Sequence, residues 1–173
     1  MKWAARMILV LAIVITAAFL TWAVVRIVKA VDFNINCEQY IKRAVEASTV
    51  DRAMEELEKA IQYAEEHELT EGIVSIFLKQ PANDVGFWYN NMVDAHRELS
   101  NLPKDASSLE KTNVLMKLRE SLSDESKSGA KVNVPSGISI YPANKAYFWW
   151  GLLSFIFMCI AWPCTVRAYD EWG

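Results

Sequence analysis

The side chains best suited to chemistry in this sequence are two histidines and three cysteines. His67 stands among carboxylates in AEEHELTE, at the expected end of a helix, which is typical of a solvated or dipole-paired imidazole. His96 falls on the apolar stripe of another predicted helix, which is typical of a partly buried histidine bonded to a neighbour. Neither lies at a spacing that predicts a metal ligand or a general base.

Two glutamate clusters resemble a cation site only superficially. A calcium site needs several oxygens on a loop that wraps the ion, whereas carboxylates on a helix fan outward. The pairs Glu38 with Lys42 and Glu55 with Lys59 have the spacing that supports an exposed helix. We therefore interpret both clusters as solvated faces: Glu55, Glu56 and Glu58, and Glu65, Glu66 and Glu68.

Known catalytic patterns are missing from the sequence. It contains no His-x-x-x-His, Cys-x-x-Cys, glycine-rich phosphate loop or G-x-S-x-G. We expect no catalytic, cofactor-binding or metal-binding site, and no enzyme activity.

The triplet Phe87, Trp88 and Tyr89 indicates an interaction surface. Consecutive helical positions point about 100° apart, so three adjacent aromatics cannot all face one core stripe. At least one must meet another surface. That surface is either the connector GIVSIFL at residues 72–78, or a partner, a ligand or the lipid headgroup region.

Two long uncharged runs predict transmembrane helices, at residues 7–25 and 146–166. In helical form the first is about 28 Å long, close to the thickness of one hydrocarbon core. A buried helix of a soluble protein would show a polar face, and this run shows none. A cleaved signal peptide is the stronger alternative, but the run is longer than such a segment, and Arg26 and Lys29 occupy the would-be cleavage region. We therefore expect an uncleaved signal anchor.

Tryptophans stand at or near the ends of both runs, as expected of side chains that settle at membrane interfaces. The predicted anchors are Trp3, Trp22, Trp149, Trp150, Trp162 and Trp172. Small residues recur at packing intervals inside the runs, which favours an antiparallel hairpin or pairing with partner helices. These are Ala12 with Thr16, Ala17 with Thr21, and Gly151 with Ser154. Neither run holds an Asp, Glu, Lys, Arg or His residue, which argues against a self-sufficient transporter.

Residues 33–144 predict a soluble, mainly helical domain. Asn36, Thr49 and Ser107 are suitable N-caps for three of its four expected helices, and Ser107 forms a capping box with Glu110. Another helix follows Asn83. The predicted fold class is thus all-α, with a short extended ribbon around the turn at residues 135–137.

The second of these helices illustrates the expected faces. Its buried stripe is Ala53, Leu57, Ala60, Ile61 and Ala64, and Gly72 is expected to end it. Leu57 should tolerate no charge, whereas Glu56 should face solvent and tolerate lysine.

Charge is divided unevenly along the chain. Residues 32–145 hold thirteen Lys and Arg against nineteen Asp and Glu, a net charge of −6, and the remainder carries +3. An acidic middle argues against nucleic acid as a partner. Three cysteines cannot form a disulfide framework, and Cys159 and Cys164 are expected to act as small apolar residues. Cys37, if exported, is an odd thiol that could pair between chains.

The short tails, residues 1–6 and 167–173, decide the expected orientation. The positive-inside bias applies to short loops, so Lys2, Arg6 and Arg167 favour cytoplasmic termini. The acidic domain is then extracytoplasmic, at a bacterial inner membrane or a plasma membrane. Cys37 would lie just outside the bilayer, where a membrane-impermeant maleimide should label it.

The sequence therefore predicts a small two-span membrane protein that acts through protein association, as a scaffold or accessory subunit. Its partners are the lipid bilayer and another membrane protein or a second copy of the chain. One alternative is an extracytoplasmic ligand-sensing domain that signals through a partner, because few residues follow the second span. Another is a phage-type membrane lesion protein.

Overall fold

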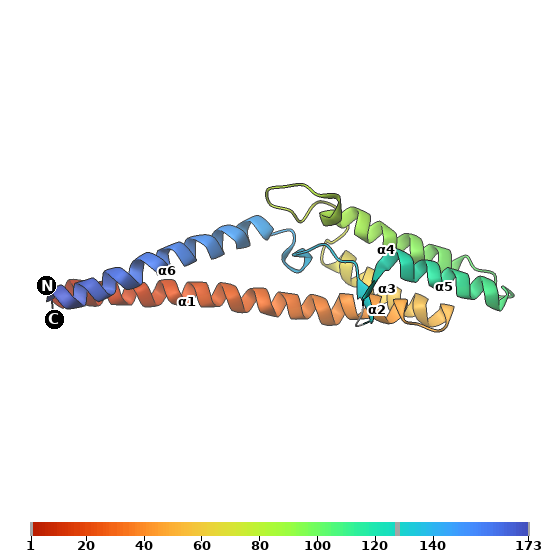
Figure 1. Ribbon diagram of the computed structural model, residues 1–173, viewed down its shortest axis with the longest axis horizontal. Coiled ribbons are helices and arrows are strands. Elements are labelled where there is room, and N and C mark those ends of the chain that lie inside the picture. Colours follow the sequence, from red (N-terminus) through yellow and green to blue (C-terminus); the bar gives the residue numbers. More distant parts are fainter. Residues whose placement is uncertain (1, 127–128, 173) are drawn as a thin grey trace. The chain divides into compact units, whose positions relative to one another are not determined.

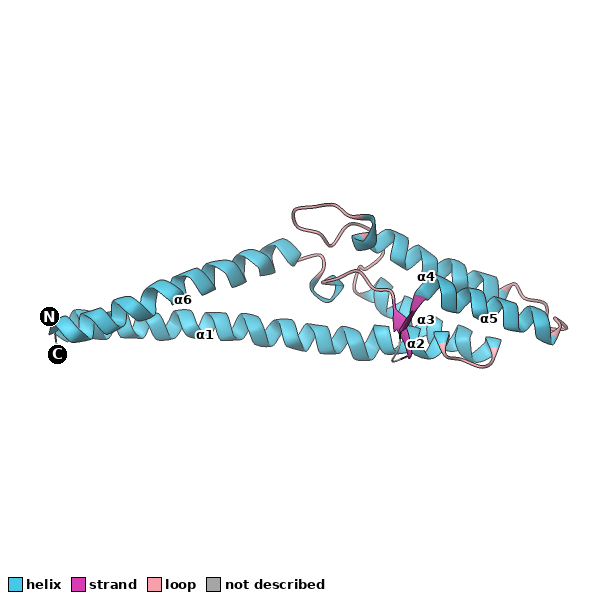
Figure 2. Ribbon diagram, in the orientation of Figure 1, coloured by secondary structure: helices cyan, strands magenta, loops and turns pink. Residues whose placement is uncertain are grey.

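The computed structural model describes residues 2–126 and 129–172 and is mostly helical, as predicted (Figures 1 and 2). It divides into two compact units. The first unit takes in the described residues of 1–29 and 143–173, and the second unit is Ala30–Pro142. The elements are α1 (Lys2–Phe33), a π-helical turn (Asn34–Glu38), α2 (Gln39–Val45), α3 (Val50–Glu66), a 3-10 turn (Pro81–Asn83), α4 (Val85–Ser100), α5 (Ser108–Leu122), β1 (Ser123–Ser126), β2 (Gly129–Val132), a 3-10 turn (Ile138–Ile140) and α6 (Asn144–Trp172).

Two of the helices, α1 and α6, are long and apolar enough to cross a membrane. The helix that begins with α1 does not stop before Asn36, so the predicted cap there is wrong. Asn36 instead donates to Asp32 Oδ1 at 2.8 Å, and the helix runs through the π-helical turn into α2. The extra residue of that turn keeps Phe33, Cys37 and Ile41 on one buried face, which favours an unbroken helix.

The other two predicted caps are confirmed. The hydroxyl of Thr49 accepts from Arg52 N at 3.4 Å. Ser107 and Glu110 form the reciprocal box, with Glu110 N donating to Ser107 Oγ at 3.2 Å and Ser107 N donating to Glu110 Oε2 at 2.7 Å. These bonds from Ser107 lower the pKa of the Glu110 carboxyl.

Helix α3 ends earlier than Gly72. Leu69 N donates to Ala64 O at 2.7 Å and Glu68 N to Glu65 O at 3.2 Å, which are the two hydrogen bonds of a Schellman cap. Glu68 occupies the left-handed position of this cap, with φ 57°. Leu69 is buried in the core, and this packing ends the helix before Gly72. The prediction from Gly72 took account of local sequence only and not of this tertiary contact.

Replacing Glu68 with glycine should therefore stabilise the second unit. The backbone of the exposed Glu68 is strained, because its φ is positive and a residue with a Cβ disfavours that conformation. Glycine relieves this strain and should raise the free energy of unfolding by about 0.5–1 kcal/mol. Urea denaturation of residues 30–142 measures it. Glu58→Gly, at an exposed position inside α3, is the matched control and should lose about 1 kcal/mol.

The predicted ribbon is in part wrong. Strands β1 and β2 form an antiparallel pair that aligns Ser123 with Val132, so the extended structure lies before the turn at residues 135–137. The second extended piece is instead the 3-10 turn that follows Gly137, whose φ is 87°. Ile138 and Ile140 are both buried in this turn.

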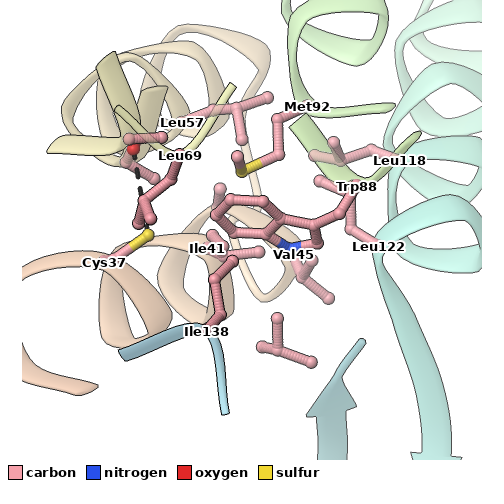
Figure 3. Close-up of a cluster of buried hydrophobic side chains, with 14 of the residues drawn as sticks. Cys37, Ile41, Val45, Leu57, Leu69, Trp88, Met92, Leu118, Leu122 and Ile138 are labelled. Atoms are coloured by element: carbon pink, nitrogen blue, oxygen red, sulfur yellow. Dashed lines mark hydrogen bonds between the residues drawn. The ribbon is translucent and has the colours of Figure 1, made fainter. Parts of the chain in front are cut away.

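The core of the second unit lies where α2, α3, α4 and α5 meet (Figure 3). Trp88 and Met92 of α4 pack here with Leu57 of α3 and Leu118 of α5. Four members of the predicted stripe of α3 are confirmed, because Ala53, Leu57, Ala60 and Ala64 are fully buried, whereas Ile61 is only half-buried.

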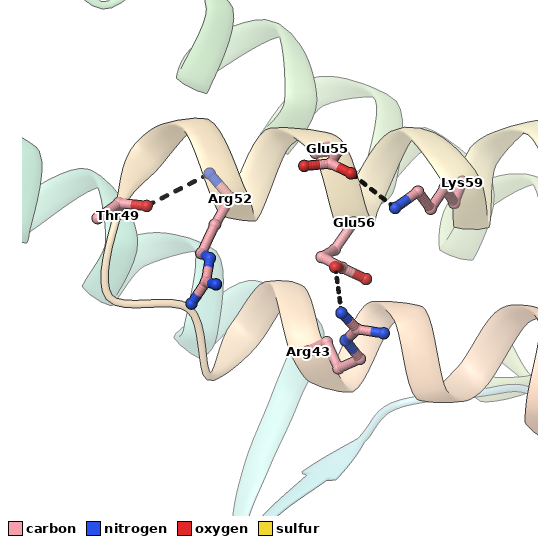
Figure 4. Close-up of polar contacts among 6 residues, drawn as sticks. All are labelled: Arg43, Thr49, Arg52, Glu55, Glu56 and Lys59. Carbon is pink, nitrogen blue, oxygen red and sulfur yellow. Dashed lines mark hydrogen bonds and ion pairs between the residues drawn. The ribbon is translucent and has the colours of Figure 1, made fainter.

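The expected exposure of Glu56 is wrong. Glu56 is only 8% exposed and pairs with Arg43 of α2 across 2.6 Å, as Figure 4 shows. Helix α2 packs on the flank of the α3 stripe, and this flank includes Glu56. Within the described residues its second oxygen, Oε2, accepts no hydrogen bond. Glu55, one position earlier, is exposed and pairs with Lys59 at 2.8 Å, as predicted.

Glu56→Lys should therefore destabilise the second unit by about 2 kcal/mol. The change places an ammonium beside the Arg43 guanidinium at a buried position, although exposure of Arg43 moderates the repulsion. Chemical denaturation of residues 30–142 measures the loss. Glu58→Lys makes the same charge change on the exposed face of α3 and should shift stability by less than about 0.5 kcal/mol. Equal effects of the two changes would contradict the assigned face.

Candidate functional site

The aromatic triplet begins α4, and its three members have different surroundings. Asp84 caps the helix by accepting from Phe87 N at 2.9 Å. Trp88 is buried against Phe33, with ring centroids 6.3 Å apart. Tyr89 is half-buried and donates to Glu65 Oε1 at 2.6 Å, a bond that raises the pKa of Tyr89 to about 12. Phe87 is 65% exposed and is the member of the triplet that faces solvent.

A pocket of about 570 Å³ lies beside Phe87 and Trp88. It joins the start of α4 to the end of α5 and to the segment that follows β2. Its apolar lining, besides the two aromatics, is Pro81, Ala82, Leu122, Val134 and Pro135. Its polar lining is Asp84, Asn91, Ser121, Asp124 and Asn133.

The electrostatics of the pocket favour a cation or a neutral amphiphile. Asp84 and Asp124 contribute carboxylates, and none of the described lining residues is basic. One oxygen of Asp84 is engaged in the helix cap. The pocket can therefore accept an apolar group against Phe87 and a hydrogen-bond donor or positive charge at its acidic side.

Sequence reasoning found Phe87 and Trp88 but missed the rest of the pocket. Asn91 follows Phe87 by four positions and so shares its helix face, a signal that was available. Asp124 and residues 133–135 join the site because the β1–β2 pair follows α5 directly and Asn133 N donates to Leu122 O at 2.9 Å. No local pattern predicts that contact.

The connector before α4 is paired at its beginning and exposed at its tip. Ile73 bridges Asp84, Val85 N donates to Gly72 O at 2.9 Å, and Val74 is buried. Phe77 and Leu78 are 69% and 72% exposed.

In the first unit, α1 and α6 make specific contacts. Trp22 Nε1 donates to Tyr147 O at 2.7 Å, and Trp162 Nε1 donates to Thr16 Oγ1 at 3.1 Å. Gly151 lies against the indole of Trp22, since a Cβ there would come within 2.5 Å of two ring carbons. The ring of Phe19 lies 5.9 Å from that of Phe155.

The predicted packing residues are distributed over two faces. Ala12, Gly151 and Ser154 are buried, and Thr16 is half-buried. Ala17 and Thr21 are exposed, and the Thr21 hydroxyl donates to Ala17 O at 2.9 Å within its own helix.

Both helices expose most of their large apolar side chains. Of the predicted anchors, Trp3, Trp149, Trp150 and Trp162 are exposed and Trp22 is half-buried, while the side chain of Trp172 lies outside the described part of the chain. Exposed aliphatic and phenyl side chains include Val10, Leu11, Ile13, Val14, Leu20, Val24, Leu153, Phe155, Ile156, Phe157 and Ile160. Contiguous apolar surface of this extent is unfavourable in water and is typical of contact with lipid or protein.

The two histidines lie in separate surroundings. His67 stacks on Tyr63, with ring centroids 4.0 Å apart, and its Nδ1 lies 3.0 Å from Tyr63 O. His96 is half-buried. Across residues 2–126 and 129–172, no three His, Cys, Asp or Glu side chains are grouped to hold a metal ion.

Cys37 is fully buried and carries a free thiol, which corrects two expectations. A thiol in the core cannot pair between folded chains, and maleimide should not reach it without unfolding. The apolar stripe through Phe33, Cys37 and Ile41 explains this burial. Burial also raises the pKa of the Cys37 thiol from 9.0 to about 12.

This shift predicts a loss of stability at alkaline pH. The folded state holds the proton more tightly than the unfolded state, so the contribution is complete below pH 9 and declines as pH rises toward 12. Between pH 8 and pH 10 the thiol should account for a loss of about 1.4 kcal/mol. Urea denaturation of residues 30–142 at both values measures it. Cys37→Ala should remove this pH dependence, whatever its effect at pH 8.

No protein-family profile, curated protein or solved structure matches this chain.

Proposed function

We propose that the chain is an integral membrane protein that acts through protein association, as a scaffold or accessory subunit. In this proposal α1 and α6 cross the bilayer as an antiparallel hairpin. The observation that carries the proposal is the exposed, uncharged apolar surface of both helices. Transfer of that surface from water to hydrocarbon is favourable by about 25 cal/mol per Å².

An exposed aromatic side chain on the second unit and exposed small residues on the first support protein association. Phe87 is exposed at the rim of a pocket, and exposed aromatics beside a pocket are common anchors of protein interfaces. The first unit adds exposed small residues at Ala17 and Thr21, on a face of α1 not used by α6 in the contacts above. Such residues let a further helix approach closely.

Affinity purification of the full chain from membranes in a mild detergent tests the association. We expect a stoichiometric partner or self-association. Phe87→Ser should reduce recovery of the partner at least fivefold, and Leu109→Ser, which changes an exposed apolar residue on α5, should not. A chain that purifies alone and as a monomer would contradict the proposal.

The orientation proposed is that of cytoplasmic termini and an extracytoplasmic second unit, in a bacterial inner membrane or a plasma membrane. Cys37 cannot report it, because it is buried. Lys104→Cys, in the exposed turn between α4 and α5, can do so after Cys159 and Cys164 are changed to serine. An impermeant maleimide should label it in intact cells. Labelling only after lysis would reverse the orientation.

The pocket supports a second candidate function, a ligand-sensing domain that signals through a partner. Its volume of about 570 Å³ and mixed lining suit a small amphiphile. A panel of small amines and neutral amphiphiles should then raise the melting temperature of residues 30–142. Asp124→Asn should weaken the response to amines and spare the response to neutral compounds. A panel without any response would remove the support for sensing.

A further inference from the structure

The loop between α3 and α4 ends in an apolar tip held away from the core. Phe77 and Leu78 are 69% and 72% exposed, and the exposed Lys79 follows them. Hydrogen bonds fix the base of the loop: Val74 N donates to Asn83 O at 3.0 Å, and Asn83 Nδ2 donates to Ser75 Oγ at 2.9 Å. The tip is thus presented outward by an ordered base.

The base of this loop is bonded to the segment through which the chain leaves the second unit. Tyr141 OH donates to Glu71 O at 2.9 Å, and its ring fills the space where Gly72 has no side chain. Tyr141 stands five residues before position 146, where the second uncharged run begins. Five residues extend at most about 17 Å. The loop base therefore cannot lie far from any bilayer that α6 crosses.

The segment through which the chain enters the second unit independently limits the distance between the first uncharged run and the end of α3. Tyr63 OH donates to Asp32 Oδ2 at 2.9 Å, which ties the end of α3 to the end of α1. Asp32 follows residue 25 by seven helical positions, a rise of about 10 Å. The loop follows directly from this end of α3.

The turn between α4 and α5 lies at the opposite end of the second unit from the segments through which the chain enters and leaves it. In Figure 1, α4 and α5 lie side by side, with their connecting turn at the end away from the α3–α4 loop. A helix of 16 residues, the length of α4, is about 24 Å long. Of these two loops, only the α3–α4 loop, with its apolar tip, lies at the end where the chain enters and leaves the second unit.

We propose that this tip, residues 76–79, inserts into the membrane interface beside the spans. Phe77 and Leu78 enter the boundary between headgroups and acyl chains, and the Lys79 ammonium contacts lipid phosphate. The insertion gives the second unit a third attachment and fixes which face it turns to a partner. This inference rests on the proposed membrane integration.

Fluorescence quenching by nitroxide lipids in phosphatidylcholine and phosphatidylglycerol vesicles tests it on the full chain. A fluorophore is attached at Gln80→Cys or at Lys104→Cys, with Cys159 and Cys164 changed to serine and Cys37 buried. Headgroup nitroxides should quench the label at position 80 at least threefold more than the label at 104. In Phe77→Ser with Leu78→Ser, quenching at 80 should fall to the level at 104, with an unchanged circular dichroism spectrum.

A label on native Cys159, with Cys164→Ser, separates the two proposals. It lies within α6, and nitroxides deep in the acyl chains should quench it strongly. If Cys159 is quenched but positions 80 and 104 behave alike, tip insertion is wrong and the tip is left for a protein partner. If Cys159 is not quenched, membrane integration fails and the tip proposal fails with it. If the label at position 80 is still quenched in the Phe77→Ser, Leu78→Ser variant, the proposal that the tip inserts is also wrong.

Discussion

Leu57→Asp should unfold the second unit. Leu57 is fully buried in α3 and belongs to the cluster in Figure 3. An aspartate there loses the buried isobutyl group and places an unpaired carboxylate among apolar side chains, a cost of about 4 kcal/mol or more. A domain of this size is stable by only about 5–15 kcal/mol, so the change removes most or all of the folded population.

Far-ultraviolet circular dichroism and urea denaturation of residues 30–142 measure this effect. The wild-type fragment should be soluble and mostly helical. Leu57→Met keeps volume and apolarity and should cost less than about 1.5 kcal/mol. A helical spectrum and a cooperative transition in Leu57→Asp, with the wild-type midpoint, would show that α3 does not pack as described.

Gly151→Leu should disrupt the contact between α1 and α6. A Cβ at this position already lies 2.5 Å from carbons of the Trp22 ring, so a leucine must displace the indole. Displacement also removes the hydrogen bond from Trp22 Nε1 to Tyr147 O. We expect a loss of roughly 3 kcal/mol from helix pairing, because overpacking and the lost bond act together.

Near-ultraviolet circular dichroism and thermal melting of the full chain in a mild detergent measure this loss. The tryptophan signal should weaken, and the first unit should melt at a lower temperature. Cys159→Leu adds a similar side chain to an exposed position of α6 and should change neither reading. A Gly151→Leu protein that melts like Cys159→Leu would mean that Trp22 does not pack on α6.

Local signals were enough to predict much of the helical structure. Thr49 and Ser107 were predicted as caps because a cap depends on residues only three positions away. The buried stripe around Leu57 follows from helical periodicity alone. The two apolar helices needed only length and composition.

The errors arose where distant segments compete with local preference. Asn36 has a capping side chain, but the buried face through Cys37 and Ile41 continues the helix past it. Glu56 looks solvated on α3 until α2 brings Arg43 against it. Glu68 takes a left-handed conformation because Leu69 is drawn into the core.

The candidate site shows the same division. The spacing of three aromatics indicated that one must leave the core, and Phe87 does so. Which of the three would leave depends on how α4 packs against Phe33 and Glu65, residues distant in sequence. The acidic side of the pocket, with Asp124, depends on the fold of the β1–β2 pair.

The central claim is that this chain lies in the bilayer and functions in a complex. The most direct test is the mass of particles extracted from native membranes into polymer-bounded lipid discs, purified through a tag on the chain. We predict discs in which the 19.7 kDa chain is accompanied by further copies or by a second protein at fixed stoichiometry. Recovery of the chain from the soluble fraction, or as a single copy alone in its disc, would contradict the account.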